Sequence, residues 1–126
     1  MEQLQIAARF TIHEGQVEKF KSLVAECVSI VRKKTPDILQ YDWFFNDQLM
    51  ECILLEKYPD SKALLMHLSD IGDLLGKLLA VADLKAEIFG DPSQELLNVI
   101  ASLDKTIYYF HQGVKREVSE PSASLS

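Results

Sequence analysis

The pattern of apolar and polar residues predicts a strand followed by a long helix at the start of the chain. Apolar residues occupy every second position from Leu4 to Ile12, which is the period of a strand. From residue 16 to about residue 34 they recur every three or four positions, as on one stripe of an amphipathic helix. Pro36 ends this helix, because the residue before a proline avoids helical backbone angles.

A hairpin is predicted next. Residues 38–46 and 49–58 are rich in aromatic and aliphatic side chains and have the length of strands. The polar pair Asp47-Gln48 separates them and forms a short turn. Two strands joined in this way pair antiparallel, so the aromatic side chains of the first lie beside the second.

A second helical stretch is interrupted by glycine. It is opened by Pro59-Asp-Ser and runs from residue 62 to about residue 80. Gly72 and Gly76 lie inside it, and each costs on the order of 1 kcal/mol relative to alanine. We therefore expect a break or kink near residues 70–72.

The last third of the chain predicts a strand, a short helix and a second short strand. Residues 82–89 alternate as a strand does. A turn at 90–93 follows, and Asp91 is the expected cap of a helix that reaches about residue 103. Residues 106–111 form a last short strand or an extended arm, which could exchange onto a partner subunit.

The element order β-α-β-β-α-β is the ferredoxin-like, split βαβ arrangement of an α+β fold, with both long helices on one face of an antiparallel sheet. We expect one domain over residues 1–116 and a disordered, polar tail at 117–126. Residues 43–45 are three successive large aromatics and cannot all face the helices. The strands are apolar on both faces, so we expect a homodimer that packs sheet against sheet.

Composition excludes several classes of protein. The chain has 126 residues, a net charge of −6 and a pI near 5.0, which argues against a nucleic-acid or anionic-membrane surface. No apolar run approaches the roughly 20 residues of a membrane span, and the N-terminus lacks a signal peptide, so a cytoplasmic protein is expected. No residues have metal-ligand spacing, and no glycine loop for nucleotide phosphates is present.

His67 and Glu56 are the candidate catalytic residues. His67 lies on the apolar stripe of its predicted helix, and Glu56 interrupts an apolar strand face, so a buried pair is expected. The pair could equally be a structural contact that anchors helix to sheet. Tyr41, Trp43 and Tyr58 are the candidate substrate-binding residues, although large aromatics on strands are more often core or interface.

The remaining ionisable residues have simpler interpretations. Cys27 and Cys52 are expected to be buried apolar residues rather than nucleophiles. Arg9 is expected to pair with a carboxylate such as Asp42, with the holding of an anionic substrate as the alternative. The two other histidines, His13 and His111, are expected to be exposed.

Several of these segments resemble the antibiotic biosynthesis monooxygenase (ABM) family of dimeric α/β barrels. The resemblance covers roughly residues 4–111, and the following motifs carry it: Phe10-x-Ile12-x-x-Gly15, Tyr41-x-Trp43, Leu54-Leu-Glu56-Lys-Tyr58-Pro-Asp60, Ala63-Leu-x-Met-His67 and Gly90-Asp-Pro-Ser-x-Glu-Leu-Leu97. It implies a cofactor-independent oxygenase of quinol-like or polyphenolic aromatics. The haem-degrading branch is disfavoured: the first strand lacks its asparagine, Trp43 is on the second strand, and His67 is about one turn early.

The leading hypothesis is therefore a monooxygenase that acts on a small aromatic hydroxy compound without metal or flavin. His67, held by Glu56, would take the phenol proton, and the resulting carbanion would react directly with O₂. The alternative is a dimeric protein that binds a small ligand or is associated with stress, without catalysis. The two differ in whether His67 and Glu56 face an open cavity or a packed core.

Overall fold

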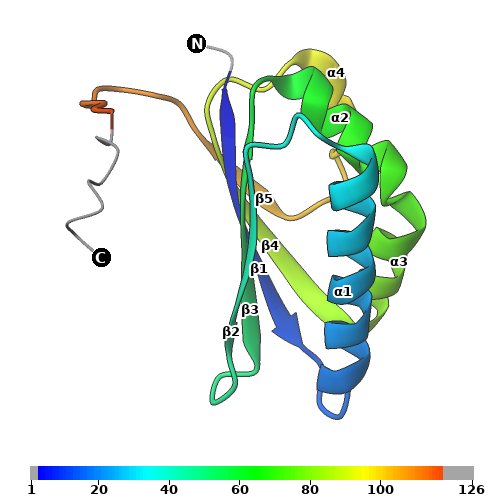
Figure 1. The fold of residues 1–126 in the computed structure, drawn as a ribbon. Coiled ribbons are helices and arrows are strands. Elements are labelled where there is room, and N and C mark those ends of the chain that lie inside the picture. The colour runs from blue at the N-terminus through cyan, green and yellow to red at the C-terminus, as the bar shows by residue number, and fades with distance from the viewer. Residues whose placement is uncertain (1–2, 118–126) are drawn as a thin grey trace, which may run out of the picture.

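The computed structural model describes residues 3–117 of the chain, as a single sheet covered on one face by helices (Figure 1). The elements, in chain order, are β1 (Leu4–Ile12), α1 (Val17–Lys34), β2 (Gln40–Asn46), β3 (Glu51–Tyr58), α2 (Ser61–Asp70), α3 (Gly72–Val81), β4 (Ala82–Phe89), α4 (Gln94–Val99) and β5 (Lys105–Tyr108). The predicted ferredoxin-like α+β order is confirmed.

The sheet has the strand order β2-β3-β1-β4-β5. The first four strands are antiparallel to their neighbours, whereas β5 pairs parallel with β4. In this single chain the short last strand therefore extends the sheet of its own subunit. Exchange of the arm onto a partner stays a prediction.

The predicted break in the second helical stretch is confirmed. Helix α2 ends at Asp70, α3 begins at Gly72, and Ile71 between them is buried. At the other end of α2, the Asp60 carboxylate accepts a hydrogen bond from the Ala63 main-chain N–H at 2.8 Å, which caps the helix. This cap fixes where α2 starts relative to β3.

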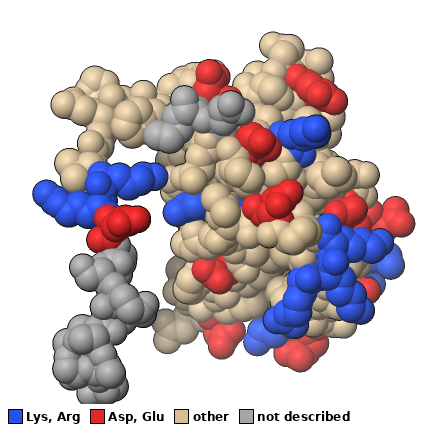
Figure 2. Space-filling view, turned by 45° about the horizontal axis from the view of Figure 1, so that its top comes forward, with Lys and Arg blue, Asp and Glu red and all other residues tan. Residues whose placement is uncertain are grey.

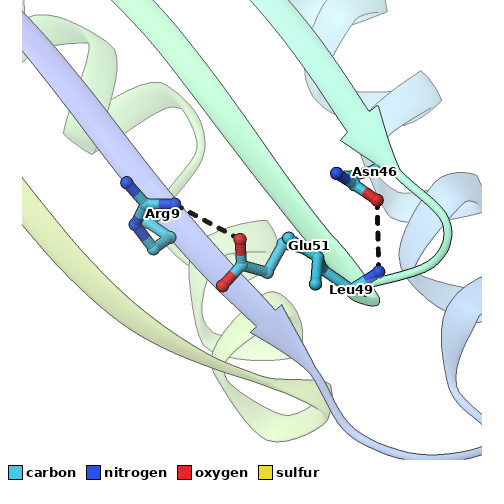
Figure 3. A network of polar contacts seen from close by, with 4 residues as sticks. All are labelled: Arg9, Asn46, Leu49 and Glu51. Carbon is cyan, nitrogen blue, oxygen red and sulfur yellow. Dashed lines mark hydrogen bonds and ion pairs between the residues drawn. The ribbon is translucent and has the colours of Figure 1, made fainter.

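Two local details differ from the sequence prediction. The β2–β3 turn spans residues 47–50 rather than two residues, with Met50 at φ 53° and the Asn46 side chain accepting from the Leu49 N–H at 3.1 Å (Figure 3). Helix α4 is capped by the Ser93 hydroxyl, not by Asp91, and it ends at Val99. Ser93 occupies the position directly before the helix, from which a side-chain oxygen reaches the N–H three residues on.

The outer face of the sheet, away from the helices, mixes charged and apolar side chains. Arg9 lies here and contacts Glu51 on β3 at 3.3 Å (Figure 3). The predicted pairing with Asp42 is wrong: the strand register places Glu51 within reach of the arginine, and Asp42 accepts from Gln40 instead. Phe44 also points outward and is 55% exposed.

Charged side chains are distributed unevenly over the molecule. In the view of Figure 2, acidic groups are scattered, whereas basic groups gather mainly at one side. The chain after β5 runs away from the sheet on the side opposite the helices (Figure 1). The tail predicted to be disordered lies outside the described residues, apart from residue 117. No helix within residues 3–117 is long and apolar enough to cross a membrane.

Candidate functional site

Two ionisable side chains lie inside the core between the sheet and α2. Glu56, on the inner face of β3, is 8% exposed, and His67, on the buried stripe of α2, is 1% exposed. The sequence prediction that both face the interior is confirmed. The other two histidines are exposed, also as predicted, and His13 contacts Asp83 at 3.1 Å.

The expected hydrogen bond between Glu56 and His67 is not formed. Glu56 Oε1 and His67 Nε2 are 4.0 Å apart, beyond hydrogen-bond distance. Glu56 Oε1 instead accepts a hydrogen bond from the Tyr58 hydroxyl. Because Glu56 and Tyr58 are two residues apart on one strand, their side chains leave the same face of the sheet.

Burial shifts both groups towards their neutral forms. It raises the pKa of Glu56 to about 7, an effect that the Tyr58 hydrogen bond partly counteracts. It lowers the pKa of His67 to about 4, with the Asp70 carboxylate acting in the opposite direction. At neutral pH His67 is therefore uncharged, while Glu56 lies near its midpoint and can both accept and return a proton.

An apolar cavity of about 70 Å³ lies beside these residues. Tyr41, Trp43, Glu56 and His67 are part of its lining, and nearly all its other lining residues are aliphatic. Tyr58 is fully buried and is not part of the lining, so its direct contact is with Glu56 rather than with a ligand in the cavity. Tyr41 and Trp43 line the cavity, so the prediction that they face the interior is confirmed.

Three residues that line the cavity each have a buried polar atom without a hydrogen-bond partner. The atoms are the Tyr41 hydroxyl, the Trp43 indole Nε1 and the His67 Nδ1, and within residues 3–117 no other buried side-chain N or O atom is unsatisfied. Buried polar groups are rarely left unpaired, because each costs about 1–3 kcal/mol. All three atoms belong to residues that line one cavity.

The aromatic rings hold this wall in place. Trp43 stacks on Phe10 with ring centroids 5.7 Å apart, and Tyr41 meets Trp43 edge-on at 5.8 Å. The Tyr41 ring also lies 5.2 Å from the imidazole of His67. Tyr41 and Trp43 are thus core residues and cavity residues at once, since one side of each ring system packs on protein.

The two cysteines are buried free thiols, as predicted. Burial raises the pKa of Cys27 to about 11 and that of Cys52 to about 12, so neither is a thiolate at neutral pH. Burial also raises the pKa of Tyr41, and the nearby Cys27 and Glu56 add to this. The Cys27 thiol is only a weak acceptor for the Tyr41 hydroxyl. No group of three His, Cys, Asp or Glu side chains in the described part of the chain could hold a metal ion.

Sequence reasoning missed the far end of the cavity. Ile100 and Leu103, from the segment between α4 and β5, and Lys105, the first residue of β5, complete the lining there. The alternation of Lys105 and Ile107 in a short strand was a signal that both share one face. It could not show that this strand would join β4 and so bring a lysine to the cavity.

Neither a protein-family model nor a curated protein matches this chain. Among solved structures, MupZ from Pseudomonas fluorescens is similar, with a TM-score of 0.79 at 24% identity, over 92% of this chain and 96% of that one. SnoaB from Streptomyces nogalater, a cofactor-independent oxygenase, has a TM-score of 0.61 at 16% identity, over 75% and 97% of the two chains. A protein named antibiotic biosynthesis monooxygenase has a TM-score of 0.59 at 23% identity, over 68% and 92%.

At these identities the comparisons establish the fold. The resemblance to antibiotic biosynthesis monooxygenases that the sequence motifs indicated is confirmed at that level. A shared fold does not fix a reaction, because one fold hosts many chemistries. The reaction of this chain therefore depends on the chemistry of its own cavity.

Proposed function

We propose that this protein is a cofactor-independent monooxygenase that binds a small aromatic hydroxy compound in the cavity beside Glu56 and His67. The observation that carries the proposal is the group of three unsatisfied polar atoms, on Tyr41, Trp43 and His67, around one apolar cavity. The names of two structural neighbours, an antibiotic biosynthesis monooxygenase and a cofactor-independent oxygenase, support the reaction type.

The size of the cavity restricts the substrate. A volume of about 70 Å³ admits several water molecules, each of which needs at least about 10–15 Å³. It is well below the roughly 300–1,000 Å³ of pockets for drug-sized ligands. A single aromatic ring is therefore the substrate scale that this cavity suits, and a polycyclic compound would require the walls to move.

In the proposed mechanism Glu56 is the proton acceptor. Its pKa of about 7 makes it a better base at neutral pH than His67, whose pKa is lowered to about 4. From the sequence we expected His67 to take the proton and Glu56 to hold His67, so the proton acceptor is a different residue here. The Trp43 N–H and the Tyr41 O–H would donate to the substrate oxygen, and neutral His67 would supply a third donor when its Nδ1 carries the proton.

The substrate supplies all the electrons. Loss of the phenol proton to Glu56 leaves an electron-rich ring that carries carbanion character at the para carbon. That carbon forms a bond to O₂, the O–O bond breaks, one oxygen atom stays as a carbonyl and the other leaves as water. A phenol with a free para position thus gives a para-quinone, with O₂ reduced by the four electrons that the ring loses.

We also propose that the protein is a homodimer. Phe44 on the outer sheet face is 55% exposed, and Ile53 and Leu55 beside it are only half-buried in the single chain. Covering them with a second sheet would remove apolar area from water. Light scattering after size exclusion should give twice the 14.3 kDa chain mass, and Phe44→Lys should reduce it to one chain.

The alternative is a protein that binds a small ligand without turnover. The small volume of the cavity favours it, because reaction with O₂ needs space beside the bound ring. The two functions make different predictions for oxygen consumption, although both predict binding of a phenol.

The test is an oxygen-electrode assay with a panel of monocyclic phenols whose para position is free. We expect protein-dependent O₂ consumption above the rate of buffer alone, and a loss of about 10²-fold or more in Glu56→Gln. Glu51→Gln is the matched control, because Glu51 lies on the same strand but on the outer face. Binding without O₂ consumption by any compound would favour the ligand-binding alternative. An undiminished rate in folded Glu56→Gln would remove Glu56 as the base.

A further inference from the structure

Five residues in register cross the inner face of the sheet beneath the helices. One residue comes from each strand, in the order Trp43, Leu54, Ala8, Ala86 and Lys105. We call this set the alanine row, after the two alanines at its centre. All five line the cavity. Two small side chains at the centre of the row leave open space between a tryptophan at one end and a lysine at the other.

Lys105 is an unusual residue for this position. It lies at the first position of β5 and is only partly exposed, on the same face as Ile107. Its Nζ has one polar contact, a weak one of 3.5 Å to the Leu103 carbonyl oxygen. Within residues 3–117 no carboxylate lies within 4.0 Å of it. It is also the one Lys or Arg among the residues that line the cavity.

A half-buried lysine can cover apolar surface with its methylene groups while its ammonium group stays hydrated. No carboxylate of the described residues neutralises the Lys105 charge from within 4.0 Å, so this charge is available to an anion that enters the cavity. Because the chain as a whole has a net charge of −6, a lysine here is also not explained by a general basic surface. An anionic group of the ligand would supply the missing counter-ion.

The two ends of the row offer complementary chemistry. Four strand spacings of about 4.8 Å separate the main chains of Trp43 and Lys105 by about 19 Å. Both residues line the same cavity, so a ligand bound in it lies between them. The buried, unsatisfied His67 Nδ1 and the Trp43 N–H lie towards the β2–β3 end, where a hydroxyl would be received.

We infer that Lys105 binds an anionic substituent, and that the ligand of this cavity is a hydroxyaryl carboxylate. Its ring would lie over Ala8 and Ala86, its carboxylate would contact Lys105 Nζ, and its hydroxyl would face Glu56. This inference rests on the proposed function for the position of the hydroxyl. It adds the charge of the substrate and a residue that determines specificity.

The test compares two probes that differ in charge but not in shape, 3-hydroxybenzoate and 3-hydroxybenzamide, both of which leave the carbon para to the hydroxyl free for the proposed reaction. Their dissociation constants are measured by isothermal titration calorimetry under nitrogen, so that no turnover occurs. We expect wild-type protein to bind the carboxylate at least about tenfold more tightly than the amide, as for a charge-assisted contact in a partly buried site.

The variants separate a specific contact from a general effect of charge. Lys105→Met keeps the length of the side chain and should abolish the preference for the carboxylate, whereas Lys105→Arg should keep it. Lys85→Met is the matched control: Lys85 precedes Ala86 on β4 but is exposed on the outer face, and its loss changes the net charge equally. This control should bind both probes as wild type does.

Three outcomes would overturn the inference: equal affinity of wild type for both probes, an intact preference in Lys105→Met, or binding of neither probe. The oxygen-electrode assay distinguishes these from failure of the proposed function. A charge preference without O₂ consumption leaves the Lys105 site standing and removes the oxygenase. Equal affinity for both probes together with protein-dependent O₂ consumption removes the Lys105 site and leaves the oxygenase.

Discussion

Glu51 and Glu56 lie on the same strand, five residues apart, but one is partly exposed to solvent and the other is buried in the core. An odd separation places them on opposite faces of the sheet. The Glu51 side chain is 26% exposed and contacts Arg9 at 3.3 Å on the outer face. Glu56 is 8% exposed, has a tyrosine hydroxyl as its partner and lines a cavity.

This difference shows that burial, rather than residue type, makes a carboxylate chemically useful. An exposed ion pair such as Arg9–Glu51 contributes between 0 and about 1 kcal/mol. Burial of Glu56 raises its pKa from 4.5 to about 7, which corresponds to a cost of about 3 kcal/mol for its ionised form. The inner face thus carries a destabilised, reactive group, and the outer face a solvated one.

Replacing the buried histidine should have the largest effect. His67→Phe preserves a ring of similar size but removes the donor to the substrate oxygen, so the rate should fall by about 10²–10³-fold. His13→Phe, at the exposed pair with Asp83, should leave the rate unchanged. Oxygen consumption at saturating substrate measures both. Equal rates in the two variants, with both folded by circular dichroism, would contradict a role for the inner face.

The pH dependence of stability should sharpen the comparison further. Between about pH 4.5 and 6.5 the unfolded chain carries a proton on His67, whereas the folded protein carries it on Glu56. Folding therefore changes the number of bound protons by almost nothing in this window. The two residues together should contribute a nearly constant free energy of unfolding there.

Replacing either residue should reveal the pH dependence of stability that the other one contributes. In Glu56→Gln only the lowered pKa of His67 remains, so stability should rise by about 3 kcal/mol from pH 4 to 6.5 relative to wild type. In His67→Phe only the raised pKa of Glu56 remains, so stability should fall by a similar amount from pH 4.5 to 7. Urea titrations at each pH measure both slopes, and Glu51→Gln is the control. Parallel curves for all three variants would refute the assigned pKa shifts.

Tyr58→Phe should have a smaller effect on the same face. The Tyr58 hydrogen bond favours ionised Glu56, so its loss should raise the pKa of Glu56 further. Because Glu56 must be ionised to act as the base, the rising limb of the pH–rate profile should move from about pH 7 to higher pH. The plateau rate at high pH should be retained. A lower plateau with an unmoved limb would mean that Tyr58 acts on the substrate directly.

The smallest effect is expected at the outer pair. In the single-chain Phe44→Lys background, Arg9→Gln and Glu51→Gln should each change the free energy of unfolding by less than about 1 kcal/mol, and less still at high salt. The double variant should differ little from the sum of the two, as measured by urea unfolding. A cost of several kcal/mol in this background would show that the pair is not solvated as an exposed ion pair is.

Much of this structure could be predicted because periodicity is a local property. The alternation of Leu4 to Ile12 placed β1 with correct bounds, and Gly72 marked the break between α2 and α3. Errors arose where a few hydrogen bonds decide the outcome. The β2–β3 turn needed an Asn46 side-chain bond, and Ser93 competed with Asp91 for the cap of α4.

The sequence by itself determined which residues face inward. Period and apolar neighbours were sufficient to place Glu56 and His67 in the core, because side-chain direction follows from position along one element. Their partners were decided by the tertiary structure alone. Strand register is set between segments far apart in the chain, so no local pattern could bring Trp43, Ala8 and Lys105 into one row. Likewise, only packing of α2 on the sheet leaves His67 4.0 Å from Glu56, beyond hydrogen-bond distance.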